Sequence, residues 1–92
     1  MTPLEYGRKI LQEQPFSVLL GTELTLLEPG KAELRLSLDH KHQQQHGFAH
    51  GGVIAYLADN ALTYAGGSVL GNPITLEMKI NYIRPGIGAA LI

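Results

Sequence analysis

The longest apolar pattern in the chain lies between Val53 and Ala65. Its apolar residues recur every three or four positions, at Val53, Ile54, Leu57, Ala58, Ala61, Leu62 and Ala65. This spacing places them along one face of a helix, so we predict a helix over residues 51–65 with that face buried. The glycine pair Gly66-Gly67, followed by Gly71-Asn72-Pro73, is expected to end the helix.

A period of two precedes this helix and predicts an antiparallel hairpin. Apolar Leu34, Leu36 and Leu38 alternate with Glu33, Arg35 and Ser37, as in a strand with one buried face. Residues 22–28 are its expected partner strand, because Pro29-Gly30 between the two suits a type II turn. A second alternation predicts a strand over residues 74–83, and the apolar run 89–92 predicts the start of another.

The N-terminal residues predict a short covering helix. Thr2 can cap a helix that begins at Pro3, and Pro15 should stop it. We interpret residues 16–20 as an apolar lead-in segment that Gly21 ends, and the polar residues 40–45 as a loop. The order of elements indicates an α+β fold in which one long helix packs on an antiparallel sheet.

Length and composition limit the classes of protein that are possible. Ninety-two residues fit a single domain over 1–92, and 45% apolar with 16% charged residues is typical of a globular chain. A net charge of −1 gives no electrostatic basis for binding nucleic acid. The absence of cysteine excludes disulfides and a thiol nucleophile. No apolar run approaches the roughly 20 residues of a membrane span, so we predict a cytoplasmic protein without a membrane partner.

The predicted helix carries two features that suggest chemistry. At its head, His50-Gly51-Gly52 should offer free backbone N–H groups and the positive end of the helix dipole, which suit an anion or a developing oxyanion. In its middle, Asp59 interrupts an apolar sequence, where burying an unpaired carboxylate is costly. An oxyanion cradle and a buried acid on one helix point to acyl chemistry.

These residues also carry a family resemblance. The segment GFAHGGVIAYLADNALTYA (residues 47–65), followed by TLEMKINYIRPG (residues 75–86), resembles the hotdog-fold acyl-CoA thioesterases. It is most similar to the branch with the phenylacetate-pathway and 4-hydroxybenzoyl-CoA thioesterases. The resemblance covers residues 19–86 and implies a hotdog fold whose helix is wrapped by five or six strands. It further implies hydrolysis of acyl-CoA to acid and CoA without a cofactor, in homodimers that often pair into homotetramers.

The resemblance implies roles for individual residues. The Gly51 N–H would polarise the thioester carbonyl, and Asp59 would act as general base or as nucleophile. Thr75 lies near the position of a Ser or Thr that helps to hold the attacking water. Gln44 and Gln45 stand where many members of the family have an asparagine, so the amide is kept on a longer side chain.

Three further residues are candidates at the same site. His50 either takes part in catalysis or orients the loop before the helix. Gly52 and Arg84 are the predicted contacts to coenzyme A, with Arg84 directed to its phosphates. Four histidines lie close in sequence, namely His40, His42, His46 and His50, but no acid or cysteine set accompanies them, so we predict no metal site. We expect such loop histidines to be solvated.

Spacing along the helix predicts that the site is shared between chains. Gly51 and Asp59 are eight residues apart, which is about 12 Å along the helix axis. A two-fold dimer would bring the Asp59 of one chain to the Gly51 of the other. The alternatives to a thioesterase are an acyl-CoA-binding domain without turnover, a hotdog dehydratase, and a chain incomplete at its C-terminus that folds poorly. For the last, the unpaired run 89–92 predicts low stability.

Overall fold

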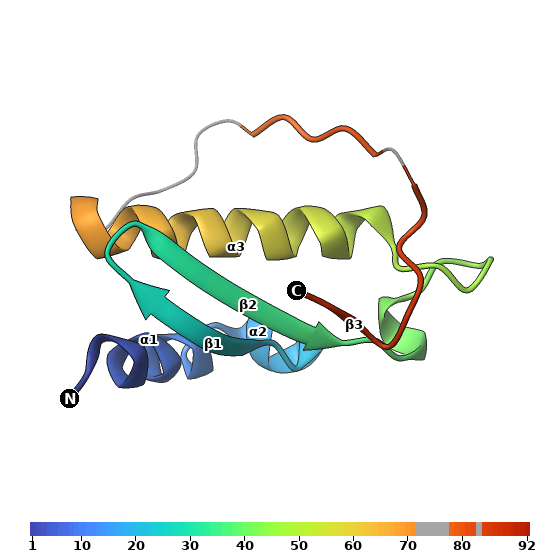
Figure 1. Ribbon diagram of the computed structural model, residues 1–92. Coiled ribbons are helices and arrows are strands. Elements are labelled where there is room, and N and C mark those ends of the chain that lie inside the picture. The colour runs from blue at the N-terminus through green and yellow to red at the C-terminus, as the bar shows by residue number, and fades with distance from the viewer. Residues whose placement is uncertain (72–77, 83) are drawn as a thin grey trace.

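The computed structural model describes residues 1–71, 78–82 and 84–92 (Figure 1). Its elements are α1 (Pro3–Gln12), α2 (Pro15–Leu20), β1 (Glu23–Glu28), β2 (Lys31–Ser37), the 3-10 helix η1 (His40–His42), α3 (Gly51–Leu70) and β3 (Ala90–Leu91). The strands form an antiparallel sheet in the order β1-β2-β3, and the long helix α3 lies across it. The predicted α+β arrangement is therefore confirmed.

The hairpin forms as its pattern predicts. β1 and β2 pair antiparallel up to Glu28 opposite Lys31, and Gly30 at the turn has a φ of 74°, which the second central position of a type II turn requires. The side chains of Leu34 and Leu36 are 1% and 0% exposed. They join a core with Val53 and Leu57 of α3 and with Leu11, Leu20 and Leu24. This packing fixes α3 on the sheet.

The predicted end of the long helix is wrong. α3 continues through Gly66-Gly67 to Leu70 and ends at Gly71, where φ is 96°. A glycine inside a helix costs only about 1 kcal/mol relative to alanine, and tertiary contacts on both sides of the pair outweigh that cost. Before the pair, the Tyr64 hydroxyl donates to the Gly7 carbonyl at 2.8 Å. After it, Ser68 Oγ accepts from the Gly30 N–H at 2.7 Å.

Two other predictions before α3 are corrected. Residues 16–20 form most of the helix α2, because Pro15 occupies its first turn and Gly21, with a φ of 79°, caps its end. Six residues are too few to show a helical period, so the apolar run alone did not reveal it. The segment 40–45 is not wholly irregular either, since it begins with η1, which the Asp39 side chain caps.

The strand predicted over residues 74–83 lies partly outside the described residues, namely at 72–77 and 83. In the described part, Met78 to Tyr82, no strand is present. This segment passes along the side of α3 away from β2 (Figure 1), so it lacks the neighbouring strand that an alternating pattern needs in order to form a ladder. The start of a strand at residues 89–92 is confirmed, because Leu91 and Ala90 pair with Leu36 and Ser37 of β2. Within the described residues, no helix is long and apolar enough to cross a membrane.

Candidate active site

One backbone N–H group is left open at the head of α3. His50 caps the helix, and its Nδ1 accepts a hydrogen bond from the Gly52 N–H at 2.9 Å. The Gly51 N–H, in contrast, donates to none of the described residues. The free donor at the helix head is therefore the N–H of Gly51, whereas the His50 side chain bonds to the backbone of the first helical turn.

A buried histidine holds this helix head in place. The His50 N–H donates to the His42 carbonyl at 2.8 Å. The His42 ring is 1% exposed; its Nδ1 accepts from the Asp39 N–H at 3.0 Å, and its Nε2 lies 2.8 Å from the Leu20 carbonyl. Since an N–H can only donate, Nδ1 is the acceptor and Nε2 carries the proton. The expectation of solvated loop histidines is wrong for His42, which is a structural anchor.

Gly51 lines a cavity together with several other predicted site residues. The cavity has a volume of about 320 Å³ and is lined by Gln44, Phe48, Ala49, Gly51, Ile54, Tyr82, Arg84, Pro85 and Gly86. The Tyr82 hydroxyl donates to the Gly51 carbonyl at 2.8 Å, which fixes the wall of the cavity against the helix head. Arg84 is thus brought together with Gly51 and Gln44, from which it is distant in sequence.

The two glutamines differ in position. Gln44 lines the cavity, but its Oε1 accepts from the backbone N–H groups of His46 and Phe48, so this amide oxygen organises the turn around Gly47. Gln45 is exposed and does not line that cavity. Gln44 is therefore the better placed of the pair. The remaining candidate, Thr75, lies outside the described residues.

Asp59 lies on α3 in an unusual environment. Among the buried side-chain oxygens and nitrogens of the described residues, Asp59 Oδ1 is the one without a hydrogen-bond partner. Leaving such an atom unpaired costs roughly 1–3 kcal/mol, more if the group is charged. Because α3 is continuous from Gly51 to Leu70, Asp59 lies about 12 Å along the helix axis from Gly51. One chain therefore does not bring the two groups to one thioester.

A buried polar cluster sets the rotation of α3. The Tyr56 hydroxyl lies 2.6 Å from Ser17 Oγ and 2.8 Å from Thr22 Oγ1, and Asn60 Nδ2 donates to Ser17 Oγ at 3.3 Å. These bonds connect α3 to α2 and to the segment before β1. Asn60, which takes part in them, directly follows Asp59 in the sequence. The sequence pattern did not reveal this cluster, although a polar Asn60 inside an apolar helix was the available signal. No group of three potential metal ligands occurs in the described part of the chain.

Comparisons with known proteins agree with this geometry. The sequence profile of the thioesterase superfamily matches residues 46–88. A thioesterase family protein from Silicibacter pomeroyi is 32% identical with a TM-score of 0.87, over 97% of this chain and 68% of that one. A mutant of the phenylacetic acid degradation protein PaaI from Thermus thermophilus is 36% identical with a TM-score of 0.76, over 84% of this chain and 67% of that one. The 1,4-dihydroxy-2-naphthoyl-CoA hydrolase of Listeria monocytogenes is 35% identical over 67% of this chain and 51% of its own length.

The chain belongs to the thioesterase superfamily, and its long helix on an antiparallel sheet is that of the hotdog fold. The predicted family and fold are thus confirmed. The chain spans about half the length of the curated relatives that it matches.

Proposed function

We propose that this protein hydrolyses acyl-CoA thioesters to free acid and coenzyme A, as a homodimer with sites shared between chains. The observation that carries the proposal is the buried, unpaired Oδ1 of Asp59 on a helix whose head presents the open Gly51 N–H. A buried carboxylate oxygen kept without a partner despite its cost is typical of a group used in a reaction. The name of the Listeria relative, a hydrolase of an aryl-CoA ester, supports the class of substrate.

The Gly51 N–H stabilises the oxyanion in this proposal. It donates to the thioester oxygen at the positive end of α3, and a single donor of this kind contributes about 2.7–4 kcal/mol to the transition state. Arg84 lines the same cavity and is exposed, so its guanidinium can meet the phosphates of coenzyme A. The Gly52 N–H is occupied by His50 in this structure, which leaves Gly52 to permit close approach of the ligand rather than to donate.

Asp59 of the partner subunit supplies the second half of the reaction. As a general base it takes a proton from water, whose oxygen attacks the carbonyl carbon. The tetrahedral oxyanion then collapses and expels the CoA thiolate, which takes up the proton. As a nucleophile the carboxylate attacks the carbonyl itself, expels the thiolate and forms a mixed anhydride that water hydrolyses. Thr75 remains the proposed residue for holding the water in either route.

A thiol-release assay on a panel of acyl-CoA esters tests the function, with Asp59→Asn as the variant. We expect the variant to bind acyl-CoA but to hydrolyse it at least about 100-fold more slowly. Its thermal stability should equal or exceed that of the parent, because a half-buried carboxylate with one unpaired, buried oxygen is replaced by a neutral amide. Hydrolysis within about threefold of the parent would refute the role of Asp59. A parent that binds acyl-CoA and releases no thiol would instead be the non-catalytic binding domain.

A further inference from the structure

The buried polar cluster around Tyr56 has a fixed direction of hydrogen bonding. The Ser17 hydroxyl donates its one proton to Gln14 Oε1 at 2.6 Å. Ser17 Oγ can therefore only accept from the Tyr56 hydroxyl, which lies 2.6 Å away. Because the proton of Tyr56 is then used, the Thr22 hydroxyl is the donor in its 2.8 Å contact with Tyr56. The hydroxyl groups thus form one directed chain, from Thr22 to the amide oxygen of Gln14.

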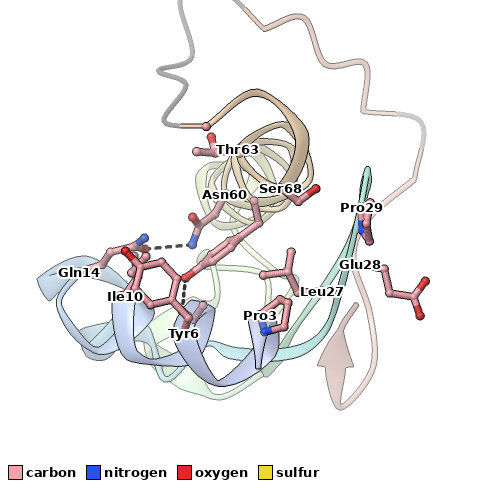
Figure 2. Close-up of a pocket in the computed structure, with 14 residues that line it drawn as sticks. Pro3, Tyr6, Ile10, Gln14, Leu27, Glu28, Pro29, Asn60, Thr63 and Ser68 are labelled. Carbon is pink, nitrogen blue, oxygen red and sulfur yellow. Dashed lines mark hydrogen bonds between the residues drawn. The ribbon is translucent and has the colours of Figure 1, made fainter. Parts of the chain in front are cut away.

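Asn60 joins this chain from the next turn of α3. Its Nδ2 donates to Gln14 Oε1 at 3.2 Å and to the hydroxyl oxygens of Ser17 and Tyr56 at 3.3 Å. Figure 2 shows the Asn60 side chain directed from α3 toward Gln14, and both residues line a cavity of about 340 Å³ between α1 and α3. Tyr56 and Asn60 are four residues apart and therefore lie on one face of α3. Directed bonds thus connect that face to α2 and to the residues on either side of it.

A polar cluster costs free energy to bury. The side chains of Ser17, Thr22 and Asn60 are 1%, 6% and 9% exposed, so each has given up its hydrogen bonds with water. Apolar groups of the same shape would give similar or greater stability. What a fully bonded cluster adds is one defined arrangement, because hydrogen bonds weaken steeply when a helix rotates away from their geometry.

The side chain of Asp59 lies beside this face, and its direction depends on the rotation of α3. At about 100° per residue, it leaves the helix about 100° from Asn60 and about 60° from Tyr56. Its Oδ1 bonds to none of the described residues, so no neighbouring side chain holds that oxygen. A side chain ends about 5–6 Å from the helix axis, so a rotation of about 10° moves the carboxylate by about 1 Å. A misplacement of about 1 Å can lower a rate by about 100-fold.

We propose that Ser17, Tyr56 and Asn60 are positioning residues: their hydrogen bonds fix the rotation of α3 and thereby direct the carboxylate of Asp59 at the thioester. This role rests on the proposed thioesterase function, since the group that they direct is the proposed base or nucleophile. The three residues act through the helix and not on the reacting atoms.

The experiment compares two tyrosine hydroxyls of α3. Tyr56→Phe removes the hydroxyl of the cluster and keeps the ring, which packs edge-on against Phe16 with 5.0 Å between ring centroids. Tyr64→Phe is the matched control, because the Tyr64 hydroxyl also connects α3 to an N-terminal helix, by a single bond of 2.8 Å to the Gly7 carbonyl. Each variant loses a part-buried hydroxyl, so both should lower the midpoint of thermal unfolding by a similar amount, roughly 4–8 °C.

The two variants should differ in the thiol-release assay. Tyr56→Phe should lower kcat by about 10- to 100-fold and leave KM within about twofold, because a misplaced carboxylate weakens the transition state and not substrate binding. Tyr64→Phe should keep kcat within about threefold of the parent. Ser17→Ala, which opens the chain from α2, should act as Tyr56→Phe does. In the Asp59→Asn background, Tyr56→Phe should cause less than about a twofold further loss, since effects exerted through one group are not additive.

Equal losses of kcat in Tyr56→Phe and Tyr64→Phe would overturn the inference, as would a full further loss of kcat in the Asp59→Asn background. If Tyr56→Phe does not fold, Ser17→Ala takes its place in both comparisons. A parent that releases no thiol would refute the proposed function, and the positioning role is then tested through the ¹³Cγ chemical shift of Asp59. A shift that changes in Tyr56→Phe and not in Tyr64→Phe would support the role, and the same result in both variants would overturn it.

Discussion

Replacing Gly51 by proline removes the proposed oxyanion donor with little disturbance to the fold. The Gly51 N–H donates to no described residue, so no structural hydrogen bond is lost. Proline is well tolerated at the first position of a helix. The residue before a proline must be extended, and His50 already has φ −62° and ψ 135°. Gly51→Pro should therefore keep its thermal stability within about 1 kcal/mol of the parent.

The expected loss of activity follows from the missing donor. Removal of one oxyanion hydrogen bond lowers kcat by about 100- to 1,000-fold. Gly51→Ala is the matched control, because it keeps the N–H and its added Cβ would lie 3.4 Å from the Tyr82 ring, an ordinary contact. In the thiol-release assay, Gly51→Ala should stay within about fivefold of the parent. A folded Gly51→Pro protein with nearly full activity would show that this N–H does not bind the oxyanion.

The same variant tests whether sites are shared. An equimolar mixture of Gly51→Pro and Asp59→Asn chains that exchange freely gives about half heterodimers, each with one intact site of two. Activity should therefore return to about one quarter of the parent's. If mass spectrometry shows heterodimers and the mixture remains inactive, the two groups do not act across the dimer.

Two further predictions concern stability. Burial raises the pKa of Tyr64 to about 12, with a smaller contribution from Tyr56, so the folded state holds this proton more tightly than the unfolded chain, whose tyrosine titrates near 10. The contribution of Tyr64 to the free energy of unfolding should be fully present below pH 10 and be lost as the pH rises toward 12. In thermal unfolding scans from pH 9 to 12, Tyr64→Phe should therefore lose part of the fall in stability with pH. An unchanged pH dependence would contradict this assignment. His42→Ala should leave the Leu20 carbonyl and the Asp39 N–H without their partners. We expect this loss to destabilise the protein by about 2–4 kcal/mol in urea unfolding. A change below about 0.5 kcal/mol would show that the His42 bonds are dispensable.

The parts of the fold that sequence reasoning predicted are those specified by local patterns. The period of two at Leu34 and Leu36, with Pro29-Gly30 before it, specifies both a strand and its turn. The start of α3 is also specified locally, by His50-Gly51-Gly52, because a helix cap and the free N–H groups of the first turn depend on a few adjacent residues. The open Gly51 donor was predictable for the same reason.

The errors occurred where distant contacts decide the outcome. The helix passes through Gly66-Gly67 because residues on either side bond to α1 and to the hairpin turn, which no pattern within α3 reveals. The burial of His42 depends on the Leu20 carbonyl, 22 residues away, so the polar surroundings of the histidine suggested the opposite. A cavity of about 340 Å³ is lined by residues of both α1 and α3, so no pattern within either helix predicts it.

The segment between His42 and His50 has a consequence for how the protein can vary. Its ends are tied by the bond from the His50 N–H to the His42 carbonyl, and Gln43 pairs with Ala49 just inside. Gly47, with a φ of 83°, lies at the tip. Insertions at the tip leave both ends fixed, and doubling the length of such a loop costs only about 0.6 kcal/mol in closure entropy. This closed loop can therefore be lengthened or exchanged to reshape the cavity at the helix head while α3 keeps its register.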